Sequence, residues 1–324
     1  MDSLNSRFTV CREDFDRPVL VTGSSGCIGS WALAILVRAG VPAVSYDLDS
    51  SRRRPGLLMS EEELARVTWV EGDIADAEAI DRVVSENGIG AILHLAALQV
   101  PFCKADPVAG ARVNVVGTVA VFEAARRHGL RRLAYASSIA AHGAPEESPY
   151  ALTLYGAYKA CDEAIARTYW QDWAVPSIGL RPGIVYGVGR DQGMTSKTTV
   201  AILAAAAGRD YEVPFTGAIS YLYAGEVAAA FLQTIARDGD GAPAFDCNGT
   251  VAPIEDGLEA IRRLAPGAQV RASGDPLPFP MDDQDALLRA HIGDYGAISL
   301  EEGTAETFHA FQVLLQDGRV SADF

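Results

Sequence analysis

The sequence predicts an α/β protein in which a doubly wound parallel β-sheet, covered by helices on both faces, is followed by a smaller C-terminal lobe. Three observations carry this prediction. Short apolar runs rich in β-branched residues alternate with helical stretches as far as Arg181, a glycine-rich turn joins the first run to the first helix, and the alternation becomes irregular after Pro182. Strands that alternate with helices at this spacing form a parallel sheet, which binds ligands at the carboxyl ends of its strands.

The first strand and helix flank a glycine turn that suits a phosphate group. The apolar run 19–21 is followed by Gly23, Gly26 and Gly29, and a helix then continues to Gly40. The first glycine permits a tight turn, the second lets a pyrophosphate approach the backbone, and the third lets helix and strand pack closely. Amides at the start of the helix then face the anion. An ordinary turn is the alternative reading, and the context described next weighs against it.

The second strand, 43–46, ends in Asp47, which lies eighteen residues after Gly29. A carboxylate at this place accepts hydrogen bonds from an adenosine ribose. Its charge would repel a 2′-phosphate, so Asp47 favours NAD over NADP. The arginines at 52–54 leave the alternative open, because they are either a solvated loop or a site for the phosphate of NADP.

The remaining elements follow the same alternation up to Arg181. Further strands are predicted at residues 67–70, 91–97, 133–138 and 177–181, and helices at about 107–128, 155–173, 198–207, 225–236, 255–264 and 300–315. Asp76 is expected to cap the helix after the third strand, and Ser299 with Glu302 forms a capping box for the last helix. We therefore expect an N-terminal tail at 1–17, a cofactor domain at 18–181 and mainly a substrate lobe at 182–324, from which some elements return to the sheet.

Two of the predicted strands end where a cofactor would lie. Asp73 and Ile74 follow the third strand, at the edge that would meet an adenine. The fourth strand ends in Leu95, Ala96 and Ala97, also at the cofactor edge. His94 in this strand is expected to be a packed core histidine, with an acid or base role as the alternative. Asn114, inside an apolar helix, either ties neighbouring backbone together or belongs to a proton relay.

Composition narrows the class of protein. The formal net charge of −15 disfavours a nucleic acid or an anionic membrane as partner. The five cysteines are scattered without a Cys-x-x-Cys pair, which indicates reduced thiols in a cytoplasm and no metal site. The first residues lack the apolar core of a signal peptide, and no run of about 18 apolar residues is long enough for a membrane span. The acidic run 282–285 is expected to be an exposed helix N-terminus.

Tyr155 and Lys159 stand four residues apart at a helix start, so their side chains share one face. A tyrosine has a reference pKa of ~10, and lowering it to near 7 takes ~4 kcal/mol. An ammonium ~4 Å away supplies about that much at an effective dielectric constant of ~20. Lys159 can therefore make Tyr155 a working acid and base. Ser138, or failing that Ser137, is placed to hold the substrate oxygen at the end of the fifth strand.

Together these motifs resemble an extended short-chain dehydrogenase/reductase, and within that superfamily the NAD-dependent epimerase/dehydratase group. The resemblance rests on segments 22–29, 72–74, 94–97, 137–138, 155–159, 180–187 and 299–303, so it covers nearly the whole chain. It implies a Rossmann domain with a small C-terminal substrate lobe, and a homodimer formed through the helices that carry Asn114 and Tyr155. It also implies that the cofactor is lined by Gly23, Ser25, Cys27, Ile28, Asp47, Asp73, Ile74, Leu95, Ala97, Tyr155, Lys159 and Pro182.

Departures from the family pattern bear on the substrate. Nucleotide-sugar epimerases usually carry an asparagine and an arginine that contact the substrate diphosphate, and these places correspond here to Gly183 and Ile219. A buried diphosphate without such contacts is unfavourable by on the order of 3 kcal/mol or more. Arg190 or Lys197 is an alternative source of charge, although a solvated loop also explains both.

We therefore expect an NAD-dependent dehydrogenase that acts on a secondary alcohol of a sugar, uronate or sugar acid. The catalytic residues are then Ser138, Tyr155 and Lys159, and the candidate substrate contacts are Gln99, Ser138, Thr195, Ser196 and Tyr221. An epimerase that retains its NAD is the alternative enzyme, and a catalytically idle dinucleotide-binding protein is the alternative from another class.

Overall fold

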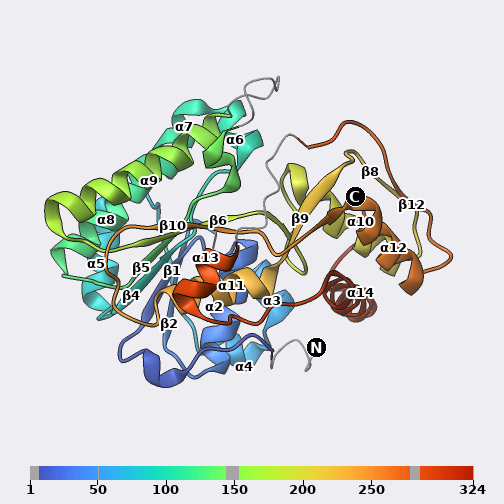
Figure 1. Ribbon diagram of the computed structural model, residues 1–324. Coiled ribbons are helices and arrows are strands. Elements are labelled where there is room, and N and C mark those ends of the chain that lie inside the picture. The colour runs from blue at the N-terminus through green and yellow to red at the C-terminus, as the bar shows by residue number, and fades with distance from the viewer. Residues whose placement is uncertain (1–6, 50, 144–152, 278–284, 324) are drawn as a thin grey trace.

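Seven parallel strands form the main sheet of the structure, a computed structural model that describes residues 7–49, 51–143, 153–277 and 285–323 (Figure 1). Their order is β10-β6-β5-β4-β1-β2-β3, and every neighbouring pair is parallel. The strands are β1 (Val19–Thr22), β2 (Ala43–Asp47), β3 (Thr68–Glu71), β4 (Ala91–His94), β5 (Leu133–Ala136), β6 (Ile178–Pro182) and β10 (Ala244–Cys247). This is the Rossmann order, extended by one strand that the chain adds after leaving for the second lobe.

Helices cover both faces of this sheet because its strands are buried on both sides. In β1, Val19 and Val21 belong to the core on one face and Leu20 to the core on the other, as the two-residue period of a strand requires. The first face is covered by α2 (Cys27–Arg38) and α11 (Ala224–Thr234), and the second by α5 (Ala77–Glu86), α8 (Gly117–Arg127) and α9 (Leu154–Trp173).

The second lobe lies beside the carboxyl ends of the main strands, at the right of Figure 1. Its strands are β7 (Ile184–Tyr186), β9 (Ala218–Tyr223) and β11 (Thr250–Pro253) in one sheet, and β8 (Tyr211–Val213) and β12 (Val270–Ala272) in another. Its helices are α10 (Lys197–Ala206), α12 (Ile254–Leu264) and α14 (Leu300–Gln316). The chain returns to the main sheet at β10, which pairs with β6, and at α11, which packs on α2.

Short helices complete the described chain. They are η1 (Arg12–Asp14), α3 (Arg53–Leu58), α4 (Glu61–Leu64), α6 (Val100–Ala105), η3 (Ile139–His142), η4 (Met194–Ser196) and α13 (Asp285–Ile292). The caps expected at Asp76 and Ser299 are both present, since Asp76 accepts from the Ala79 amide and Ser299 forms a capping box with Glu302.

Residues 7–17 are not a detached tail, because Phe8 is buried and stacks on Tyr223 at 5.6 Å between ring centroids. Two of the arginines at 52–54, expected in a loop, begin a helix instead, because α3 starts at Arg53. The acidic run also differs: 282–284 lie outside the described residues, and Asp285 is buried, accepting hydrogen bonds from the amides of Asn248 and Gly249.

The single helix expected at 107–128 consists of three segments. These are α7 (Pro107–Ala111), the π-helical turn η2 (Arg112–Val116) and α8. Within η2, the Asn114 side chain accepts from the Leu98 amide at 2.7 Å and donates to the Leu98 carbonyl at 3.0 Å.

The run Pro107–Arg127 is long and apolar enough to cross a membrane by length and composition, although half of its most apolar window is buried inside the protein. A core helix of a Rossmann layer meets the same criteria.

Candidate active site

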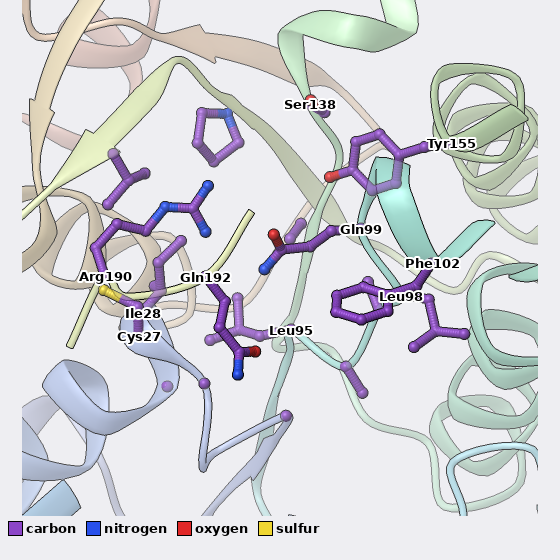
Figure 2. A pocket seen from close by; sticks show the side chains of 18 of the residues that line it. Cys27, Ile28, Leu95, Leu98, Gln99, Phe102, Ser138, Tyr155, Arg190 and Gln192 are labelled. Atoms are coloured by element: carbon purple, nitrogen blue, oxygen red, sulfur yellow. The ribbon is translucent and has the colours of Figure 1, made fainter. Parts of the chain in front are cut away.

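A cavity of about 500 Å³ runs along the carboxyl ends of the main strands, between the two lobes. Its walls include the glycine turn, Asp47 after β2, the segment after β4, the two serines after β5, and the start of α9. Figure 2 shows Tyr155, Ser138 and Gln99 on one side of this cavity, with Arg190, Cys27 and Ile28 opposite. The cavity is thus lined both by residues that the sequence predicts to bind a cofactor and by residues that it predicts to be catalytic.

The glycine turn forms a cradle that larger residues would fill. A Cβ at Gly23 would lie 2.5 Å from the Ala96 amide nitrogen, and one at Gly29 would lie 2.5 Å from the Gly23 carbonyl oxygen. Gly23 also has φ +67°, which favours glycine. Helix α2 begins at Cys27 without a side-chain cap, so its first amides are available to an anion. The turn therefore fits the pyrophosphate of a dinucleotide.

Asp47 lies at the end of the cavity beside this turn. Its carboxylate accepts from the Ser25 amide at 2.9 Å and from the Asp49 amide at 3.1 Å, which fixes its orientation toward the cavity wall. Ile74, after β3, also lines the cavity. Asp73 is not part of the wall, because its carboxylate caps the Ala75 amide and pairs with Arg112 at 2.7 Å.

The three arginines after β2 are engaged within the protein. Arg52 lies over the ring of Trp69, 4.7 Å from its centroid. Arg53 and Arg54 both pair with Asp191, at 2.5 and 2.7 Å, and Arg54 and Asp191 line the cavity. Their guanidinium groups are therefore already partnered where the sequence left open a site for a 2′-phosphate.

The segment Leu95–Ala97 forms a loop, since β4 ends at His94. Thr22 at the end of β1 accepts from the amides of Leu95 and Ala96, at 3.2 and 3.4 Å. His94 is buried between the hydroxyls of Thr22 at 2.8 Å and Thr118 at 3.2 Å. Burial, and then the Lys159 charge, lower the pKa of His94 to about 3. His94 is therefore neutral and structural, in line with the prediction of a packed core histidine.

Tyr155 and Lys159 project from the first turns of α9, whose start is capped by Thr153. Both residues line the cavity, and the Lys159 ammonium lies 5.9 Å from the centroid of the Tyr155 ring. Lys159 is buried, and it donates to the carboxylate of Asp162 at 3.2 Å.

The two serines after β5 have different partners. Ser137 is buried and its hydroxyl donates to Glu163 at 2.5 Å, where Arg181 also binds the same carboxylate. Ser138 accepts from the Ala140 amide at 3.2 Å, which leaves its hydroxyl hydrogen for a ligand. Since both line the cavity, this difference favours Ser138 as the residue that holds a substrate oxygen.

The substrate contacts expected from the sequence divide into two groups. Gln99 and Thr195 line the cavity, and Thr195 accepts from Arg190 at 3.2 Å. Ser196 and Tyr221 do not, because both are buried and donate to backbone carbonyls, Ser196 to Gly193 at 2.8 Å and Tyr221 to Ile254 at 3.1 Å. These two residues are therefore not retained as substrate contacts.

Several wall residues were not predicted. They are Leu98, Val100, Phe102, Gln192 and Met194, all in the cavity wall after β4 or after β7. The first three flank Gln99 in sequence, so proximity to the expected strand end was the only signal for them. The sequence left two possibilities for Arg190, a source of charge in the site or a residue of a solvated loop. Arg190 lies in the cavity wall, beside Cys27, the first residue of α2.

Comparison with known proteins places these features in context. The family model described as "NAD dependent epimerase/dehydratase family" matches residues 19–246. A UDP-glucose 4-epimerase of Azospirillum brasilense is 30% identical over 291 residues, covering 80% of this chain and 82% of that protein.

Solved structures agree on the fold. A UDP-glucose 4-epimerase of Thermotoga maritima with UDP-glucose superposes with a TM-score of 0.78 at 21% identity, covering 92% of this chain and 99% of that one. An L-threonine dehydrogenase of Cupriavidus necator gives 0.77 at 23% identity, covering 90% and 99%. Epimerases and dehydrogenases are thus about equally similar in fold.

Proposed function

This chain belongs to the NAD-dependent epimerase/dehydratase family, and from that premise we propose that it is an NAD-dependent dehydrogenase for a secondary alcohol of a small polar molecule. The substrate class is a sugar, a uronate or a sugar acid. The observation that carries the proposal is one cavity whose wall contains the glycine turn, Asp47 and the Ser138, Tyr155 and Lys159 side chains.

In this proposal the cofactor is held by residues at two edges of the cavity. The amides at the start of α2 bind its pyrophosphate, and Asp47 binds its adenosine ribose. Bound NAD supplies the acceptor for the hydride that leaves the carbinol carbon. Arg190 lies beside Cys27 at the start of α2, so its guanidinium adds positive charge near the same phosphates.

Tyr155 moves the proton. Its phenolate takes the hydroxyl proton of the alcohol during oxidation, and the phenol so formed returns the proton during reduction. Lys159 supplies positive charge that stabilises the phenolate, and Ser138 donates a hydrogen bond to the substrate oxygen. Burial of the lysine strengthens this effect, because charges interact more strongly away from water.

The charges of the cavity support a substrate without a diphosphate. The residues that the structure leaves out, 1–6, 50, 144–152, 278–284 and 324, include no lysine or arginine, so all 27 of these side chains are described. Of these lysine and arginine side chains, only those of Arg54, Lys159 and Arg190 line the cavity. Arg54 is paired with Asp191, Lys159 with Asp162, and Arg190 lies beside α2. Ile219, at the place of the family arginine, is fully buried in the core. With Arg190 assigned to the phosphates of the cofactor, the described cavity wall holds no further unpaired cation for the phosphates of a nucleotide sugar.

The preference for NAD over NADP rests on the charged side chains near the expected adenosine ribose. Asp47 presents a carboxylate to the adenosine ribose, and Arg53 and Arg54 are held by Asp191. The Asp47 carboxylate would repel a 2′-phosphate, and the arginines that could neutralise this phosphate are already paired with Asp191.

The second candidate is an epimerase that retains NAD, which the 30% identity to a UDP-glucose 4-epimerase favours. The discriminating experiment incubates the purified protein with NAD and a panel of sugars, uronates, aldonates and UDP-sugars. Free NADH that accumulates at 340 nm as alcohol is consumed supports the dehydrogenase. A change of stereochemistry without free NADH supports the epimerase. Loss of either activity in Tyr155→Phe, with NAD still bound, ties the chemistry to the site, whereas unchanged activity overturns both proposals.

The dimer implied by the family resemblance remains a prediction. Apolar side chains are exposed on the helices in question, with Val116 50% and Trp173 49% exposed. Light scattering of the purified protein measures the mass directly, and a monomer mass would contradict the prediction.

A further inference from the structure

The Lys159 ammonium shares its burial with a carboxylate one turn along the same helix. Asp162 lies three residues after Lys159 on α9, and its Oδ2 atom accepts from Nζ at 3.2 Å. The Asp162 side chain is 1% exposed and the Lys159 side chain is 3% exposed. The sequence motif of tyrosine and lysine gives no role to this position, and Asp162 does not line the cavity.

A lysine ammonium carries three donor hydrogens, and Asp162 uses one. Lys159 borders the cavity and Asp162 does not, so the carboxylate does not occupy space that a ligand needs, and two ammonium hydrogens remain for other acceptors. Burial raises the pKa of Asp162 above its ordinary value, and the Lys159 ammonium opposes that shift. The two groups therefore stabilise each other's charged forms.

Among the residues that the structure describes, other titratable groups near the pair do not supply this counter-charge. His94 on β4 is neutral, the Cys103 thiol on α6 is neutral because burial raises its pKa, and burial raises the pKa of Tyr135 on β5. Glu163, the next residue on α9, is committed to Arg181 and Ser137. On the described elements packed against α9, Arg112 pairs with Asp73, Glu123 with Arg126, and His142 with Asp246. Lys104 on α6 is a cation, so it adds no negative charge.

We propose that Asp162 is a positioning residue that holds Lys159 and offsets part of its charge, and that it thereby sets the pH range in which Tyr155 exchanges its proton. This inference rests on the proposed function. Its electrostatic core does not depend on the substrate, because a negative charge beside two titrating groups favours the protonated form of each. Replacing Asp162 by a neutral isostere is expected to shift the ionisation of both Tyr155 and Lys159 to lower pH.

The test compares Asp162→Asn with Asp172→Asn. Asp172 is an exposed carboxylate on the same helix, ten residues further along and so about 15 Å away by helical rise, and it contacts Gln171. Both variants lose one negative charge from α9. Asp162→Glu, which keeps the charge, is the conservative rescue. Circular dichroism and thermal melting establish that each variant is folded, and Asp162→Ser replaces Asp162→Asn if the amide does not fold.

The primary readout is the ionisation midpoint of Tyr155, followed by ¹³C NMR of tyrosine labelled at Cζ and assigned with Tyr155→Phe. We expect a midpoint about one pH unit lower in Asp162→Asn than in the native protein, and no change in Asp172→Asn. Asp162→Glu should return the midpoint toward the native value. An unchanged or raised midpoint in Asp162→Asn would overturn the proposal.

The second readout separates this inference from the proposed function. Where a substrate is turned over, the pH profile of kcat/KM should move to lower pH in Asp162→Asn by the same amount as the NMR midpoint. A profile that stays fixed while the protein turns over substrate contradicts the inference. If no substrate of the proposed class is turned over but the NMR midpoint still moves, the proposed function fails and the role of Asp162 stands.

Discussion

Glu226 provides a stability prediction that the structure makes quantitative. It lies on α11, is 2% exposed, and has its nearest cation, Arg289, at 3.7 Å. Burial, with Asp285 and Asp294 adding to it, raises the pKa of this carboxyl from 4.5 to about 7, against the opposing effects of Arg289 and the Ile298 amide. The folded protein therefore holds this proton more tightly than the unfolded chain does.

The sign follows from linkage. Because the folded pKa is the higher one, the stabilisation from this group is complete below pH 4.5 and is lost as pH rises through about 7. At 1.36 kcal/mol per pH unit, a rise of that size corresponds to about 3 kcal/mol. We expect Glu226→Gln, which mimics the protonated form, to remove this part of the pH dependence.

Urea unfolding at pH 5, 6, 7 and 8, followed by circular dichroism, measures the effect. The native protein should lose about 2.5 kcal/mol more free energy of unfolding between pH 5 and 8 than Glu226→Gln does. Glu259→Gln removes an exposed carboxylate of α12 and should leave the native slope unchanged. Parallel slopes for the native protein and Glu226→Gln would refute the assignment of this titration to Glu226.

Three further predictions concern the cavity. Gly29→Ala places a Cβ 2.5 Å from a backbone oxygen and should weaken NAD binding at least tenfold by calorimetry, whereas Gly267→Ala, which meets no atom within 4 Å, should not. Ser138→Ala should lower kcat roughly tenfold or more with little loss of stability, while Ser137→Ala should lower the melting temperature because it removes one of the donors to the buried Glu163 carboxylate; equal effects would contradict the division of roles. Asp47→Ala should raise the Kd for NAD about tenfold and narrow its preference over NADP, and an unchanged ratio of the two Kd values would count against the ribose contact.

The parts of the fold and site that could be predicted from the sequence are local. The glycine turn, Asp47 and the Tyr155–Lys159 pair each lie within or directly after one strand or helix, so period and spacing place them. The Asp76 and Ser299 caps were predicted for the same reason, because a cap depends on three or four adjacent residues.

Long-range partners explain what could not be predicted. Strands β8 and β12 have three residues each and exist because they pair across 59 positions. Asp191 binds Arg53 from 138 positions away, a partner that the spacing of nearby residues cannot indicate. Tyr221 was expected to contact substrate, but its hydroxyl donates to the Ile254 carbonyl within the second lobe.

The most direct measurement of the central claim is a crystal structure of the protein with NAD. We predict the pyrophosphate at the start of α2, the adenosine ribose on Asp47, and the nicotinamide ring against Tyr155 and Lys159. A dinucleotide bound outside this cavity, or one whose nicotinamide lies away from the Tyr155 phenol, would contradict the account.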